Sequence, residues 1–380
     1  MRKIIILILV LTLLTGCTAK PDIIDTPQTT PTIPVDSPSV DTTEPATSLS
    51  MPMITVSVPI VTDEVRSVDD TVIFRSIRQN MQLVMQEQDV ADMIILDFLS
   101  RVDQVASSSV DLSKEAESAF SGASTWTPYL CSITYAPMRI DQSVLSLYGN
   151  SLQYSGGAHA VYVSRAANYN TTTGEVLTLG SIVVNEASVD QLCSLVIAQL
   201  EDIREEKYLR ADFADTVRQR FNTEASYDEN WYFSNGGLCF YFDHYAIAPY
   251  SSGVITVEIP YSQLPGIIDD AFFPPELDTL SGDLIIVPAE NTDITRFNRI
   301  SELVLNVEAP MYLIYTEGSV QNLSITLSDA VLNNYYTVFA AQSLCEADAI
   351  VVQADVNLFR HLNISYESNG QLVTTPLLPD

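Results

Sequence analysis

Basic residues are scarce in this chain, which has 18 lysines and arginines against 48 aspartates and glutamates, a formal net charge of −30. So negative a surface repels nucleic acids and anionic lipid headgroups, and neither is expected as a direct partner. The same charge favours encounters with basic proteins or metal ions. The plain alternative is that many extracellular bacterial proteins are simply acidic.

The sequence also lacks the short motifs of several enzyme classes. It has no GxSxG elbow, no HExxH, no GxxxxGK[ST] phosphate loop and no GxGxxG after a strand. Carboxylates are too numerous for a glycosidase pair to be recognised without geometry. We therefore expect no catalytic residue and no cofactor.

Metal-binding patterns are missing as well. The only histidines are His159, His244 and His361, which argues against a histidine-rich site. Acidic pairs such as Asp63-Glu64 and Glu201-Asp202 lack the alternating oxygen ligands of an EF-hand loop. These pairs are interpreted as solvated surface, and no metal site is expected.

Cysteine is rare, and the four cysteines beyond residue 17 show no CxxC or Cys/His spacing of a zinc site: Cys131, Cys193, Cys239 and Cys345. The first and third lie in apolar strand-like runs and the second in a predicted helix, so we interpret them mainly as small buried hydrophobes. Disulfides stay open as an alternative, because an exported chain can form them and four cysteines allow three pairings.

An export signal is present at the start. Arg2 and Lys3 precede an unbroken apolar run over residues 4–14, shorter than the roughly twenty residues that span a bilayer. A charged start, an apolar stretch and small residues at a cut site are typical of a secretory signal. Leu14-Thr15-Gly16-Cys17 resembles a bacterial lipobox, in which the cysteine thiol receives diacylglycerol and the chain is cut before it.

We therefore expect a mature chain that begins at Cys17, carries a lipid there and is held at the outer face of the bacterial cytoplasmic membrane. Two acyl chains suffice for stable anchoring. An ordinary signal peptide with a chance cysteine and an uncleaved anchor helix are the alternatives. Without Arg2 and Lys3, 16 basic residues face 48 acidic ones, a formal charge of −32.

Composition divides the rest into a tether and three folded units. Residues 17–52 are rich in Pro, Thr and Ser, and such a segment cannot bury enough surface to order itself. Residues 53–170 and 171–265 are predicted as two α+β domains, and residues 281–380 as a β-rich domain. The predicted fold class is α+β, with antiparallel sheets and a few packed helices in the middle region, followed by a sandwich-like unit.

Periodicity places the elements of these units. A helix is predicted over residues 90–105, a second one opened by a capping box of Ser188 and Gln191, and a third over about 209–221. One or two strands are predicted within residues 71–85. Further strands are predicted at residues 54–58, 129–135, 143–154, 158–169, 231–233, 238–242, 254–259, 284–287, 302–307, 311–315, 323–327, 335–340, 350–356 and 361–366.

Two stretches carry a family resemblance. One is Tyr154-Ser155-Gly156-Gly157-Ala158-His159, leading into residues 168–170 and 173–179; the other is residues 241–250, followed by residues 259–262. Together they resemble the paired domains of unknown function in the ectodomain of the anti-sigma-V factor RsiV. The same pair precedes the catalytic domain of the peptidoglycan deacetylase PdaC. The resemblance covers roughly residues 53–264.

The resemblance implies a binding role, because the RsiV ectodomain is a receptor for lysozyme, a basic muramidase. This sequence shows neither a sigma-binding segment, a transmembrane helix nor a deacetylase domain, so we expect neither direct anti-sigma signalling nor deacetylation. Ala160 stands where the family usually has proline, and the unit from Ser281 has no recognised counterpart.

The two stretches supply the candidate binding residues: Tyr154, Gly156, Gly157, His159, Tyr245 and Tyr250. Each also has a plainer interpretation. The glycines suit a tight turn, His159 is explained by a bond to a turn carbonyl as well as by a ligand or acid–base role, and alternate residues of 241–250 would fill a core. Asp243 and His244 are neighbours and would point to opposite faces of a strand, so they should not form a dyad.

The sequence thus favours a non-catalytic surface lipoprotein that binds a secreted basic protein such as lysozyme. A module that binds peptidoglycan or another wall glycan is the alternative. An uncharacterised wall-modifying enzyme is the second alternative.

Overall fold

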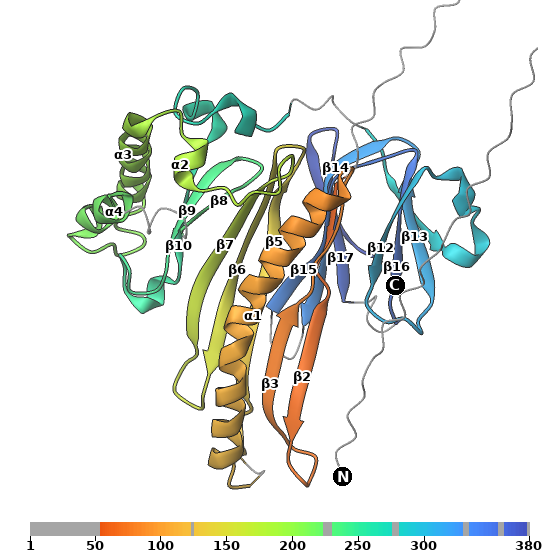
Figure 1. Ribbon diagram of the computed structural model, residues 1–380, viewed down its shortest axis with the longest axis horizontal. Coiled ribbons are helices and arrows are strands. Elements are labelled where there is room, and N and C mark those ends of the chain that lie inside the picture. The colour runs from red at the N-terminus through yellow and green to blue at the C-terminus, as the bar shows by residue number, and fades with distance from the viewer. Residues whose placement is uncertain are drawn as a thin grey trace, which may run out of the picture. The chain divides into compact units, whose positions relative to one another are not determined.

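The chain forms a mixed α+β fold in which helices cover antiparallel sheets in the middle region and strands dominate the C-terminal region (Figure 1). This confirms the predicted fold class. The computed structural model describes residues 54–122, 125–222, 230–275, 281–329, 334–355 and 361–377. The predicted signal, Cys17 and the predicted tether lie outside the described residues.

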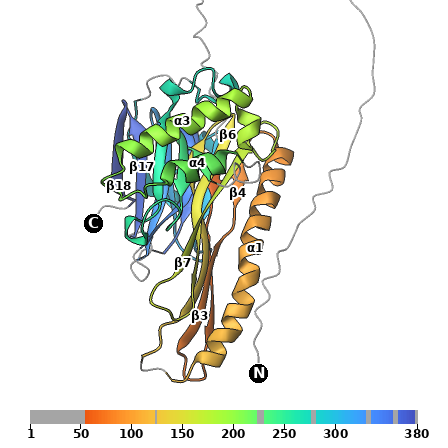
Figure 2. The same cartoon turned by 90° about the vertical axis from the view of Figure 1, so that its left-hand side faces the viewer.

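A five-stranded sheet with one long helix on its face makes the first part of the fold. The strand order is β2-β3-β5-β6-β7, antiparallel except for the parallel pair β3–β5. The elements are β2 (Ile60–Arg66), β3 (Val72–Gln79), α1 (Gln88–Ala119), β5 (Tyr129–Ile140), β6 (Val144–Tyr154) and β7 (Val161–Asn170). Both views show α1 running along this sheet (Figures 1 and 2).

Helix α1 buries a stripe that includes Ile94, Phe98 and Val102, as its predicted spacing requires. The helix continues to Ala119, well beyond the predicted end at residue 105. The second half of the helix contains a run of serines, Ser107-Ser108-Ser109. In the structure Ser107 and Ser108 donate to the carbonyls of residues three positions earlier, so their hydroxyls are satisfied within the helix.

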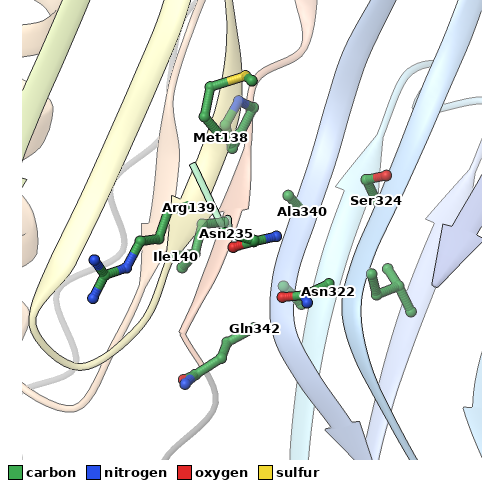
Figure 3. A pocket seen from close by; sticks show the side chains of 11 residues that line it. Met138, Arg139, Ile140, Asn235, Asn322, Ser324, Ala340 and Gln342 are labelled. Atoms are coloured by element: carbon green, nitrogen blue, oxygen red, sulfur yellow. The ribbon is translucent and has the colours of Figure 1, made fainter. Parts of the chain in front are cut away.

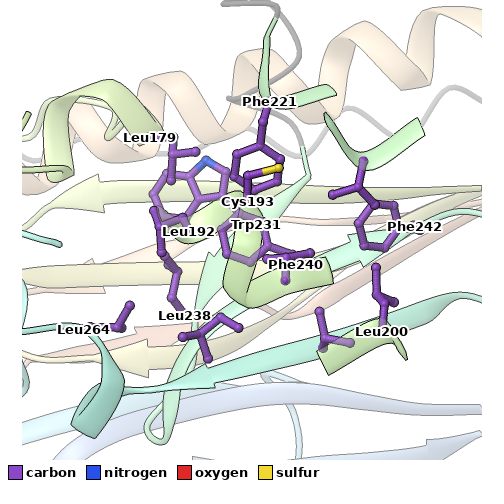
Figure 4. Close-up of a cluster of buried hydrophobic side chains, with 14 of the residues drawn as sticks. Leu179, Leu192, Cys193, Leu200, Phe221, Trp231, Leu238, Phe240, Phe242 and Leu264 are labelled. Atoms are coloured by element: carbon purple, nitrogen blue, oxygen red, sulfur yellow. The ribbon is translucent and has the colours of Figure 1, made fainter. Parts of the chain in front are cut away.

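The middle region packs two longer helices on a three-stranded sheet of order β10-β9-β8. Its elements are α2 (Leu179–Ile182), α3 (Glu186–Asp202), α4 (Phe213–Phe221), β8 (Trp231–Phe233), β9 (Gly237–Phe242) and β10 (Ile255–Pro260). Trp231 is fully buried in the core between these layers (Figure 4). The labelled residues around it are Leu179, Leu192, Cys193, Leu200, Phe221, Leu238, Phe240, Phe242 and Leu264.

The predicted capping box of Ser188 and Gln191 is wrong. Asn185 caps α3, and its side chain accepts a hydrogen bond from the Ser188 backbone N–H at 3.2 Å. A capping box does occur one element earlier, where Thr178 and Ser181 bond reciprocally at the start of α2. Asn is as good an N-cap as Ser, so the spacing to the following glutamine misled the prediction.

Two further sheets contain the C-terminal strands. Their orders are β11-β13-β16-β12 and β18-β17-β14-β15-β1-β4. The elements are β1 (Thr55–Ser57), β4 (Gln82–Val84), β11 (Leu284–Pro288), β12 (Arg299–Val304), β13 (Met311–Thr316), β14 (Ser319–Asp329), β15 (Asn334–Cys345), β16 (Asp348–Gln353), β17 (Leu362–Ser368) and β18 (Gln371–Pro376). Because Thr55 pairs with Ala341, the start of the described chain shares a sheet with its C-terminal region.

Arg139 joins the five-stranded sheet to the middle region. Its side chain is only 1% exposed and donates to Asp141 at 2.5 Å, to the Tyr261 hydroxyl at 2.7 Å and to the Phe272 carbonyl at 2.6 Å. Its guanidinium also lies over the Phe233 ring at 5.2 Å. Burial raises the pKa of Tyr261 to about 12, although the nearby Arg139 guanidinium acts to lower it. The Tyr261 hydroxyl therefore stays protonated.

The four cysteines of the described residues are free thiols; Cys131, Cys193 and Cys239 are buried and Cys345 is partly exposed. Burial raises the pKa of the Cys239 thiol to about 12, as suits a small hydrophobic residue. Within the described ranges, no helix has both the length and the apolar character to cross a membrane.

Candidate binding site

Five aromatic side chains gather beside the hairpin that joins β6 to β7: His159, Tyr162, His244, Tyr245 and Tyr250, here called the aromatic cluster. The rings of His244 and Tyr250 stack with centroids 4.4 Å apart, and those of His159 and Tyr250 stack at 4.9 Å. Tyr245 lies 5.5 Å from Tyr250, and Tyr162 lies 6.0 Å from His244. Tyr250 thus links the hairpin to the loop after β9.

Two segments far apart in sequence position these rings. His159 and Tyr162 belong to the β6–β7 hairpin and the start of β7, whereas the other three belong to the loop that follows β9. The Ser164 backbone N–H donates to the Asp243 carboxylate at 2.9 Å and ties the loop to the edge of β7. Pro249 ends the loop in an extended conformation and Tyr250 opens a short 3₁₀ turn.

Tyr245 has a left-handed backbone, with φ of 64°. This conformation costs a non-glycine residue about 1–2 kcal/mol. Arg210 holds it in place by donating to the carbonyl of Tyr245 at 3.2 Å and to that of Ala246 at 2.8 Å. The side chain so presented is 62% exposed. Burial of the ring therefore does not offset the strain.

The cluster is open to solvent. His159, Tyr162 and Tyr245 are exposed, and the other two rings are half-buried. Val161 and Val163 of β7 are exposed too, but on the face of the strand opposite to Tyr162.

An acidic segment adjoins the cluster through Arg210. Six acidic and three basic residues lie between Glu201 and Asp215. The three basic ones, Arg204, Lys207 and Arg210, each lie within ion-pair distance of a carboxylate of this segment. The segment therefore keeps a net negative charge next to the exposed rings.

The structure brings three of the six sequence-predicted residues together, namely His159, Tyr245 and Tyr250. Tyr154 instead ends β6, paired with Leu130. Gly156 has a φ of 82°, and a Cβ there would lie 3.0 Å from the Tyr129 ring, so it fits the predicted tight turn. Gly157 lies in the same turn without a positive φ.

Two interpretations of these segments are wrong. His159 stacks on Tyr250, and across the described ranges it makes no bond to a turn carbonyl. Strand β9 ends at Phe242, so Asp243 and His244 lie in a turn and not on opposite faces of a strand. The chain turns there, with the Ala246 N–H bonded to the Asp243 carbonyl at 2.9 Å.

Sequence reasoning missed Tyr162 and His244 as members of the cluster. Val161-Tyr162-Val163 has the composition of a buried strand, yet all three side chains are exposed. For His244, the sequence argued against a histidine-rich metal site and against a dyad with Asp243, and gave no partner ring. Its Nδ1 is buried and finds no hydrogen-bond partner among the residues that the structure describes.

The cluster offers stacking surfaces and hydroxyl groups. The Asp243 carboxylate, next to His244 in the sequence, accepts a hydrogen bond from the Ser164 N–H. No group of three or more His, Cys, Asp or Glu side chains in the described part of the chain could hold a metal ion.

A separate small cavity lies between β5 and strands β14 and β15 (Figure 3). Its volume is about 110 Å³, and the amides of Asn235, Asn322 and Gln342 line it. This is smaller than the roughly 300 Å³ at which pockets for drug-sized ligands begin. Its polar lining suits ordered water.

The segment that carries three of the cluster rings matches a known family. Residues 181–262 match the family described as "Protein of unknown function (DUF3298)". This DUF3298 segment runs from α2 to the turn after β10 and includes His244, Tyr245 and Tyr250. His159 and Tyr162 lie outside it. The match supports the resemblance drawn from the sequence only at the level of a domain of unknown function.

Solved structures of DUF3298 family proteins are similar to this chain. One, from Bacteroides fragilis, is 17% identical with a TM-score of 0.40 and covers 57% of this chain and 94% of its own. Another, from Pseudomonas aeruginosa, is 20% identical with a TM-score of 0.37 and covers 57% of this chain and 98% of its own. No curated protein sequence matches this chain.

Proposed function

We propose that this chain is a non-catalytic binding protein of the bacterial cell exterior, and that its aromatic cluster docks a secreted basic protein. The observation that carries the proposal is the exposed, strained Tyr245 among stacked rings. Because the sequence motifs resemble those of the RsiV ectodomain, lysozyme is the basic protein chosen to test binding. The net charge of −30 supports a basic partner.

The aromatic rings and the negative charge should contribute to binding in different ways. Tyrosine rings supply large contact areas at low entropic cost and are enriched among residues that dominate interfaces. Negative charge mainly raises the association rate of a basic partner and weakens with salt. Binding should therefore combine a salt-sensitive association rate with a dissociation rate set by the rings.

A titration of the purified protein with lysozyme at low and at moderate salt tests this proposal. We expect binding at both, with an association rate that falls as salt rises. A similarly sized acidic protein should not bind and serves as the control. Absence of lysozyme binding at low salt would remove the proposal.

We also propose that Cys17 is lipidated, which would hold the protein at the outer face of the cytoplasmic membrane. The support is the lipobox-like Leu14-Thr15-Gly16-Cys17 after a short apolar run. Mass analysis of the native protein should find an amino terminus at Cys17 with a diacylglycerol adduct. Cys17→Ser should move the protein from the membrane fraction to the soluble one. An uncut, unmodified terminus would refute lipidation.

Binding of wall glycan is the second candidate, because exposed rings such as Tyr162 and Tyr245 can stack on sugar faces. Sedimentation with purified wall material separates the two candidates. Binding to wall glycan should survive salt that abolishes charge steering. A wall-modifying enzyme remains a third hypothesis, and the release of reducing ends or acetate from wall fragments would support it.

A further inference from the structure

A polar cavity of about 160 Å³ lies at the free edge of β7, between this strand and α1. Residues from four elements are among its lining: Arg101 and Gln104 from α1, Tyr135 from β5, Ser164 and Arg165 from β7, and Asp243 from the loop after β9.

The register of the sheet explains why a space exists here. Tyr135 pairs with Gly149, and Gly149 pairs with Arg165, so the three residues form one row across β5, β6 and β7. Side chains of directly paired residues lie on the same face of a sheet. Tyr135 contacts Phe98 of α1, so Arg165 faces α1 as well. Gly149 places no side chain between them.

Arg165 is the unusual charge in this cavity. Its Nε is buried and lacks a hydrogen-bond partner within the described ranges. No carboxylate in those ranges lies within ion-pair distance of it, although the chain has 48 acidic residues for 18 basic ones. The side chain as a whole is partly buried, but a buried N–H donor without a partner is costly, so the position favours an acceptor that comes from outside.

Of the other charged groups around the cavity, Arg101 has an ion-pair partner. Arg101 bonds to Asp97 at 2.6 Å. Asp243 accepts from Ser164 and lies close enough to Arg220 to act electrostatically on it. Burial raises the pKa of Tyr135, so its hydroxyl stays protonated and able to donate. Arg165 and Asp243 both lack an ion-pair partner within the described ranges, so the cavity offers one positive and one negative group to a ligand.

We propose that this cavity binds a small monocarboxylate, held by the Arg165 guanidinium with Arg101 and the Tyr135 hydroxyl beside it. Guanidinium groups match the two oxygens of a carboxylate. Asp243 disfavours a doubly charged anion such as phosphate. The volume is below that of pockets for drug-sized ligands, so it suits molecules between acetate and a single amino acid. The proposal is independent of the aromatic cluster.

Ligand-observed NMR and calorimetry with the whole protein test the site, with acetate, alanine and inorganic phosphate as probes. Acetate and alanine should bind with dissociation constants roughly in the millimolar range, as their size allows. Alanine should bind more tightly, because its ammonium group can pair with Asp243. Phosphate should bind more weakly than acetate.

Arg165→Gln should weaken acetate binding about tenfold or more, because it removes a charge-assisted pair. Arg218→Gln is the matched control, since that arginine lies on the exposed face of α4, and it should leave binding unchanged. Asp243→Asn keeps an oxygen acceptor for Ser164 and should remove the preference for alanine over acetate. Unchanged thermal unfolding of each variant excludes a folding defect.

Two results would overturn the proposal. One is the absence of acetate and alanine binding at millimolar concentrations. The other is acetate binding by a folded Arg165→Gln protein that is as tight as binding by the original chain.

Discussion

Arg139→Ala is expected to lower the free energy of unfolding by about 3–5 kcal/mol. The substitution leaves the Asp141 carboxylate buried without its cation; the side chain of Asp141 is only 4% exposed. It also removes the donor for the Tyr261 hydroxyl and the Phe272 carbonyl. Urea unfolding followed by tryptophan fluorescence measures the change.

Arg218→Ala is the control for this prediction. Arg218 also pairs with an aspartate, at 2.9 Å, but its side chain is 57% exposed. Exposed ion pairs contribute about 0–1 kcal/mol, so this variant should unfold nearly as the original does. A loss below about 1 kcal/mol in Arg139→Ala would show that the buried contacts do not hold the sheet to the middle region.

Gly149→Ala is expected to cost at least about 3 kcal/mol, at the upper end of the range for overpacking. An added Cβ would lie 1.8 Å from the Thr134 carbonyl oxygen and 2.7 Å from the Tyr135 Cα. These are backbone atoms of β5, which cannot shift without breaking the β5–β6 pairing. Chemical unfolding of the purified variant gives the size of the loss.

Gly157→Ala is the matched substitution in the hairpin that follows β6. Its Cβ would meet only the His159 carbonyl, at 3.9 Å, and its φ is not positive. Its stability should change by no more than about 0.5 kcal/mol. Equal stabilities of the two alanine variants would contradict the close approach of β5 and β6 at Gly149.

Local patterns predicted most elements of the fold. The run at residues 238–242 is β9, and the apolar spacing after residue 188 belongs to α3. Long-range pairing was not predictable. Strand β1 was expected from its alternation, but nothing in residues 54–58 indicates that its neighbour is β15, almost 300 residues later.

The candidate site was predictable only in part, because local patterns select residues but do not show which of them meet in the fold. His159, Tyr245 and Tyr250 were selected from the family-like stretches, but their proximity depends on the bond from Ser164 to Asp243. The row of Tyr135, Gly149 and Arg165 is visible only once the register is known. Residue types indicated the chemistry of binding, whereas the pairing of strands decided which residues meet.

The lysozyme affinity of Tyr245→Ala/Tyr250→Ala, compared with that of Tyr208→Ala, tests the proposed binding site most directly. Tyr208 is the matched control, because it is an exposed tyrosine with a positive φ outside the cluster. At low salt, the double variant should bind about tenfold more weakly or worse, mostly through faster dissociation. Tyr208→Ala should bind as the original chain does. Equal affinities of the folded double variant and Tyr208→Ala would contradict binding through the aromatic cluster.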